Sequence, residues 1–223
     1  LTYQDALDFY HDHYRPQNAI LVVAGDVDVD EITALAEEVY GSIPDEAAAP
    51  VRERPPIMPI RAKRTVELTD ERVREPFTQE SWVVPSYSTA EDGVAEAIDL
   101  LAEVLGGGNT SRLYTKLVRE EGIAPSAGAY YQSTAFDDTR FVAYAVPQDG
   151  VALPALEVRI AEIIGAIATD GSTELELRRA KTNTLSAAVF AQDSQSTMAR
   201  MFGAGLTSGS TVEEIQNWPS GIA

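Results

Sequence analysis

A proline-rich, basic stretch after residue 44 most limits how this chain can fold, because it divides the chain in two. Five of the 12 prolines fall between Pro44 and Pro59. Residues 51–64 carry a net charge of +4, whereas residues 1–50 carry a net charge of −10. Proline-rich segments extend and connect domains, so we expect residues 45–64 to be a linker that lies across an acidic surface. A polybasic membrane or nucleic-acid patch is the alternative, but such patches have denser charge and less proline.

The overall composition excludes several classes of protein. The 223 residues include 17 Lys and Arg against 35 Asp and Glu, a net charge of −18, which would repel a nucleic-acid backbone. The absence of cysteine excludes disulfides, a thiol nucleophile and cysteine metal sites, and indicates no particular compartment. No apolar run is long enough to predict a membrane span. At 44% hydrophobic and 23% charged residues, the chain is expected to fold.

Hydrophobic spacing predicts an α+β fold, an antiparallel sheet with helices packed on one face. Before the linker we expect a helix over 2–14 capped by Thr2, a strand over 19–24, and a helix from Asp28 to Gly41. After the linker we expect strands near 64–69 and 79–87, helices over 89–105 and 110–121, and a hairpin of 125–133 with 139–147. Three or four helices should close the chain. One of them contains Leu153–Ile167, and two others begin with capping boxes at Thr173 and Thr211.

The residues alone predict no catalytic or metal-binding side chain. His11 and His13 are the only histidines. Side chains two residues apart on a helix point about 200° from each other, so this pair cannot share a metal ion as histidines four residues apart can. We interpret both as structural, and no histidine triad or His-rich zinc site can be built from this chain.

Two glycine-containing motifs are similar to ligand-binding loops but lack required residues. Gly106–Ser111 follows a predicted helix and has no lysine, whereas a phosphate-binding loop follows a strand and needs that lysine. We interpret it as a helix–helix turn in which Asn109 or Thr110 caps the next helix. Gly25–Asp30 alternates aspartates as calcium loops do, but it lacks the glycine and glutamate of an EF-hand.

Motifs in a fixed order identify a family resemblance that covers essentially the whole chain. They are residues 10–27 (YHDHYRPQNAILVVAGDV), 40–44 (YGSIP), 105–117 (LGGGNTSRLYTKL) and 176–181 (ELRRAK). Together they resemble the pitrilysin/insulinase family of zinc metallopeptidases, above all its bacterial branch that is similar to mitochondrial processing peptidase.

This resemblance implies a domain division. Residues 1–44 would be the C-terminal helix–strand–helix of the catalytic half, and residues 65–223 would be most of the second, non-catalytic half, truncated at its C-terminus. The start at Leu1 without a methionine and the stop at Ala223 within a helical pattern agree with a piece of a longer protein.

The resemblance places the zinc chemistry outside this chain. In the family, an H-x-x-E-H motif and a downstream glutamate bind zinc, and the glutamate of the motif activates the zinc-bound water. This motif does not occur here, and in the family order it would lie upstream of Leu1. Zinc is therefore expected in the parent protein, and this fragment is expected to be catalytically inactive and to have no metal ligand.

A substrate-binding pair of the family is also missing. The second half often supplies an arginine and, seven residues later, a tyrosine that hold the substrate and the transition state. The matching positions here are Val118 and Pro125. Arg119 is one residue away, which on a helix turns it by about 100°. Tyr130 and Tyr131, on the following strand, could reach a cavity, but the sequence does not place them in one.

This departure leaves two functional hypotheses open. In two-subunit members one subunit keeps the zinc motif while its partner keeps the arginine and tyrosine, so this chain fits a zinc-bearing subunit that needs a homologous partner. The substrate would then be an extended peptide that adds to a sheet edge as a strand. The alternative is a structural or scaffold subunit that has lost both sets of residues.

Overall fold

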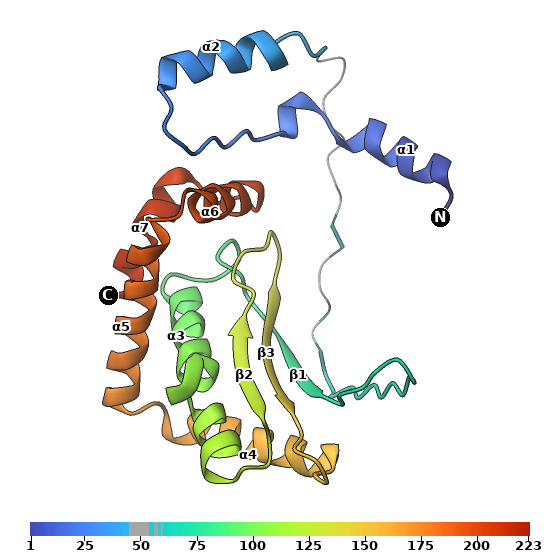
Figure 1. Ribbon diagram of the computed structural model, residues 1–223, viewed down its shortest axis with the longest axis vertical. Helices are drawn as coiled ribbons and strands as arrows, with labels where there is room; N and C mark the ends of the chain where they lie inside the picture. Colours follow the sequence, from blue (N-terminus) through green and yellow to red (C-terminus); the bar gives the residue numbers. More distant parts are fainter. Residues whose placement is uncertain (45–53, 56–57, 59) are drawn as a thin grey trace.

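The computed structural model describes residues 1–44, 54–55, 58 and 60–223 and has an α+β arrangement (Figure 1). Of the predicted linker 45–64, the structure describes residues 54–55, 58 and 60–64, and the other positions lie outside the described residues. The α-helices are α1 (Tyr3–His13), α2 (Val29–Tyr40), α3 (Val94–Gly106), α4 (Leu153–Asp170), α5 (Glu174–Ala191), α6 (Gln195–Thr207) and α7 (Val212–Ile222). The strands are β1 (Thr78–Val84), β2 (Ser126–Tyr131) and β3 (Thr139–Val146); η1 (Pro16–Asn18) and η2 (Gly108–Thr110) are 3-10 turns, and η3 (Tyr114–Glu120) is a π-helix.

The three strands form an antiparallel sheet in the order β1-β3-β2. Trp82 lies opposite Phe141, and Ala129 lies opposite Ala143. Because side chains alternate along a strand, these residues share one face, and this face packs against α3 (Figure 1). The predicted fold class is therefore confirmed. The alanines on this face allow α3 to approach β2 closely, at Gly106.

The helix α4 contributes the apolar stripe that the sequence predicts. Leu156, Ile160, Ile163 and Ile167 are buried, at intervals of three and four residues. The helix ends at Gly171, whose φ of 75° lies in the left-handed region that favours glycine.

The predicted helix starts are confirmed where a cap is encoded locally. Thr2, Thr173 and Thr211 each accept a hydrogen bond from the backbone N–H three residues later, and the acidic residue there accepts one from the cap in return. Asp28 accepts from the N–H groups of the second and third residues after it and begins α2.

Two predicted strands are wrong. Residues 19–24 and 64–69 are not strands in the described part of the chain. A strand needs hydrogen bonds from a neighbouring strand, and the only sheet among the described residues consists of β1, β3 and β2.

Two predicted helix starts also differ from the structure. The helix expected from Thr89 begins at Val94, because Gly93 has a φ of 80° and the helix cannot continue back through it. Asn109 and Thr110 belong to the turn η2, and helical residues begin only at Arg112, so the predicted caps are wrong.

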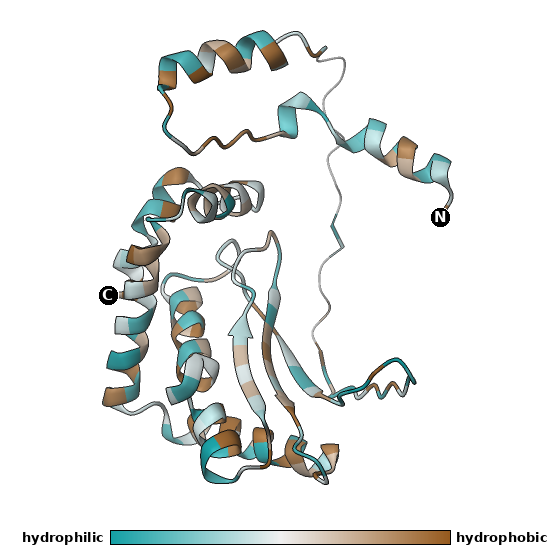
Figure 2. Ribbon diagram, viewed as in Figure 1, coloured by the Kyte–Doolittle hydropathy of each residue, from teal (hydrophilic) through white to brown (hydrophobic). Residues whose placement is uncertain are grey.

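The segment 1–44 exposes much of its apolar surface. Neither α1 nor α2 has a buried residue. Figure 2 shows apolar residues on both helices and on the extended segment between them. Leu21 is 57% exposed and Val39 is 55% exposed. In Figure 1 the helices α1 and α2 lie apart from the sheet, and the extended segment between them passes beside α6, where Val22 faces Gly203.

Candidate functional site

A hollow of about 470 Å³ lies between η3, α4 and α5. Among the described residues, its lining carries a single carboxylate, Glu176, although the whole chain has about twice as many acids as bases. The other charged lining residues are the cations Arg112, Lys116, Arg119 and Arg179, and α4 adds the apolar side chains Ile163 and Ala166. Positive charge is concentrated here, so the hollow is the candidate site.

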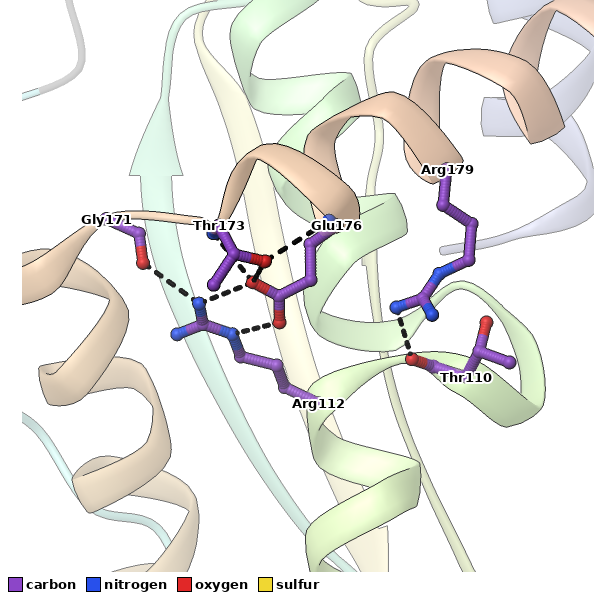
Figure 3. A network of polar contacts seen from close by, with 6 residues as sticks. All are labelled: Thr110, Arg112, Gly171, Thr173, Glu176 and Arg179. Atoms are coloured by element: carbon purple, nitrogen blue, oxygen red, sulfur yellow. Dashed lines mark hydrogen bonds and ion pairs between the residues drawn. The ribbon is translucent and has the colours of Figure 1, made fainter.

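An ion pair with two parallel hydrogen bonds forms one wall of the hollow (Figure 3). Arg112 donates from Nε to Oε1 of Glu176 at 2.7 Å and from Nη2 to Oε2 at 2.8 Å. Its Nη2 also donates to the carbonyl oxygen of Gly171 at 2.9 Å. Glu176 in turn accepts from the backbone N–H and the hydroxyl of Thr173, both at 2.8 Å. The network therefore joins the start of the η3 helix to the end of α4 and the start of α5.

The pair stays charged over the physiological pH range. The Arg112 guanidinium, together with the Thr173 hydrogen bonds, lowers the pKa of Glu176 to about 2. The hydrogen bonds that Arg112 donates to Glu176 raise the pKa of Arg112. Glu176 is therefore no proton donor or acceptor near neutral pH, and its role is to hold three elements together.

The remaining cations are compensated unequally. Lys116 forms an ion pair with Glu120 at 2.6 Å on the same helix. Arg179 donates to the carbonyl oxygen of Thr110 at 2.8 Å. This acceptor carries no net charge, so it does not neutralise the guanidinium. Among the described residues, the side chain of Arg119 has no hydrogen bond or ion pair. Two positive charges thus face the hollow without a carboxylate partner.

The positions that the family resemblance singled out lie outside this hollow. Val118 is half-buried against the core, and Pro125 is exposed just before β2. Arg119, next to Val118, is the residue that lines the hollow. This agrees with the expected rotation between neighbouring helical positions.

The two tyrosines of β2 do not line the hollow either. Tyr131 donates its hydroxyl to the carbonyl oxygen of Pro85 at 2.6 Å, and burial raises its pKa to about 12. Tyr130 is 39% exposed, and its ring lies 6.4 Å from that of Tyr144.

A second polar cluster lies between the turn before α3, α3 itself and α7. Tyr87 donates to a carboxylate oxygen of Asp99 at 2.6 Å, and Trp218 donates from its indole nitrogen to the Tyr87 hydroxyl at 2.6 Å. Burial raises the pKa of both Asp99 and Tyr87. Because all three groups are hydrogen-bonded to one another, we interpret the cluster as a structural link and not as a catalytic centre.

Both histidines lie on α1, each beside an aromatic ring. The ring of His13 packs 4.3 Å from that of Phe9, and the ring of His11 lies 5.6 Å from that of Tyr10. Within the described ranges, no group of three or more His, Cys, Asp or Glu side chains could hold a metal ion. In the same ranges no helix is both long and apolar enough to cross a bilayer.

Comparison with known proteins shows what class of protein this fold defines. The family model of the peptidase M16 inactive domain matches residues 1–184. An uncharacterized zinc protease of Mycobacterium leprae is 30% identical over 203 residues, which is 86% of this chain and 42% of that protein. The zinc protease PqqE of Helicobacter pylori is 26% identical over 206 residues, 90% of this chain and 45% of that protein. The crystal structure of a protease from Helicobacter pylori superposes on all of this chain and 53% of its own, with a TM-score of 0.84 at 23% identity.

These matches define a non-catalytic peptidase domain. The chain belongs to the peptidase M16 family, as its inactive domain. It spans less than half the length of the two relatives that are named zinc proteases. The predicted family and the predicted inactive character of the fragment are confirmed.

Proposed function

We propose that this chain is part of a zinc metalloendopeptidase and forms most of its non-catalytic half, which helps to enclose the extended peptides that the catalytic half cleaves. The observation that carries the proposal is the match of the inactive-domain model over residues 1–184. The names of the relatives, which are zinc proteases, support it.

We assign residues 1–44 to the end of the catalytic half, residues 45–64 to the linker and residues 65–223 to the inactive half. The exposed apolar surface of α1 and α2 supports the first assignment, since large exposed apolar patches indicate a missing partner surface. Residues 19–24, which have no neighbouring strand here, would add to the sheet of that half.

Zinc would be held by the catalytic half, because the described residues offer no ligand set for it. When bound, such a zinc ion activates a water molecule for attack on a peptide bond. The contribution of this chain would be to bind and orient the peptide. Its sheet ends in two edge strands, β1 and β2, and an edge strand is the element to which a peptide adds by backbone hydrogen bonds.

A homologous partner would complete the site. Val118 and Pro125 stand where the resemblance expects the arginine and tyrosine, so this chain cannot supply them. The partner would provide the pair, and cleavage would need both proteins.

The test is cleavage of an unstructured peptide by the intact protein, alone and mixed with a homologue that has the arginine and tyrosine. We expect cleavage only in the mixture, and we expect a zinc chelator to abolish it. Because Pro125 would take no part, Pro125→Ala is expected to leave the rate in the mixture unchanged within about twofold.

A different result would favour the scaffold hypothesis. If no mixture cleaves peptide and the intact protein holds no zinc, the peptidase proposal is wrong and a structural subunit remains. A large loss of activity in Pro125→Ala, with the fold retained, would contradict the claim that the partner supplies the pair.

A further inference from the structure

We propose that the hollow between η3, α4 and α5 binds a small organic anion through Arg119 and Arg179, with the apolar part of the ligand against α4. The bound group would be a carboxylate or phosphate. The proposal does not rest on peptidase activity.

Two of the arginines that line the hollow carry positive charge that no carboxylate among the described residues neutralises. Arg112 is neutralised by Glu176, and Lys116 is paired with Glu120. Arg119 and Arg179 line the same hollow, and neither has a carboxylate partner among the described residues. Like charges held together repel, and an anion between them removes this repulsion. This concentration of positive charge contrasts with the chain as a whole, which has 35 acidic and 17 basic residues.

Hydrogen bonds hold one side of the hollow in place. The forked Arg112–Glu176 pair and its bond to Gly171 fix one wall, as Figure 3 shows. Arg179 is fixed by its hydrogen bond to Thr110 and keeps further N–H donors for a ligand. Guanidinium groups match the oxygens of carboxylate and phosphate groups with two parallel hydrogen bonds. A rigid wall and oriented donors lower the entropy cost of binding.

The hollow has the size and the mixed lining of a small-molecule site. The volume of about 470 Å³ lies within the range of small-molecule sites and exceeds what a single inorganic ion fills. Ile163 and Ala166 of α4 add an apolar surface to the hollow. A ligand that combines an anionic group with a short apolar part satisfies both kinds of lining.

The experiment is methyl NMR of Ile163 in the intact protein, in the presence of a chelator so that cleavage plays no part. The probes are N-acetylleucine, its uncharged amide, and inorganic phosphate. We expect N-acetylleucine to shift the Ile163 methyl signals to saturation and the amide to have no effect. Phosphate should compete with N-acetylleucine but bind more weakly, since it leaves the apolar surface uncovered.

Two variants and a matched control locate the site. Arg119→Gln changes a side chain with no described partner, so the fold should not change, and we expect the dissociation constant to rise about threefold or more. Arg119→Gln combined with Arg179→Gln should raise it at least about tenfold. Arg178→Gln removes the neighbouring arginine of α5, which pairs with Glu174 and does not line the hollow, and should leave binding unchanged.

Three results would overturn the proposal. One is the absence of a saturable shift with N-acetylleucine. Another is an equal response to the uncharged amide, which would make the binding hydrophobic only. The third is an equal loss of binding in Arg178→Gln, which would indicate general charge attraction and not a site. If phosphate bound as tightly as N-acetylleucine, the apolar part of the proposal would be wrong.

Discussion

Glu176→Gln is expected to lower the free energy of unfolding by about 3 kcal/mol, because it leaves the mostly buried Arg112 without its counter-charge. Glutamine keeps the shape of the side chain and can still complete the capping box of α5, so the variant isolates the loss of charge. The measurement is urea unfolding at pH 7 followed by the fluorescence of Trp82 and Trp218, which both pack against the core.

The effect should depend on pH in a defined direction. The pKa of Glu176 is lowered in the folded state from 4.5 to about 2. Its contribution to stability is therefore fully present above pH 4.5 and is lost as the pH falls toward 2. We expect the difference between the wild type and Glu176→Gln to shrink over this interval.

Glu174→Gln is the matched control for this prediction. Glu174 pairs with Arg178 on the same helix, but 87% of its side chain is exposed. Exposed pairs of this kind contribute about 0.5 kcal/mol or less. An equal cost of the two substitutions would contradict the role given to the Arg112–Glu176 network.

Gly106→Ala is expected to destabilise the chain by about 3 kcal/mol or more. An added Cβ at Gly106 would lie 2.5 Å from the Cα and 2.7 Å from the carbonyl oxygen of Ala129 in β2. These are backbone atoms of a central contact between α3 and the sheet, so they cannot move aside without separating the two layers. Thermal unfolding measures the loss.

Gly165→Ala in α4 separates this packing effect from helix propensity. Nothing lies within 4 Å of the Cβ that it would add. Replacing a glycine within a helix by alanine is expected to stabilise the chain by up to about 1 kcal/mol. The two substitutions should therefore have opposite signs. A stabilising Gly106→Ala would show that α3 does not pack on β2 as described.

The sequence predicted those features that are encoded within a few neighbouring residues. The capping boxes at Thr173 and Thr211 need only a hydroxyl and a carboxylate three residues apart, and both form. The buried stripe of α4 likewise follows from its 3.6-residue period. The strand over 19–24 was wrong because a strand depends on a partner, which no local pattern reveals.

The candidate site could be predicted only in part, since it depends on residues far apart in the chain. Arg112 and Glu176 are 64 residues apart and meet only because α4 turns the chain back toward η3. Both were in motifs that the family resemblance used, but nothing local paired them. One signal in the sequence could have placed Arg179 in the site. It follows Thr173 and Glu176 at intervals of three residues, which puts all three on one side of α5.

We propose above that residues 65–223 form most of the inactive half of a zinc peptidase and that none of the residues 1–223 binds the zinc ion. This claim is tested most directly by the zinc content of the intact protein in which both histidines of this chain are replaced, His11→Gln with His13→Gln. We expect the variant to retain one zinc ion per intact protein, as the unmodified protein should. A loss of zinc in a variant that remains folded would contradict the claim and place metal ligands in the segment 1–44.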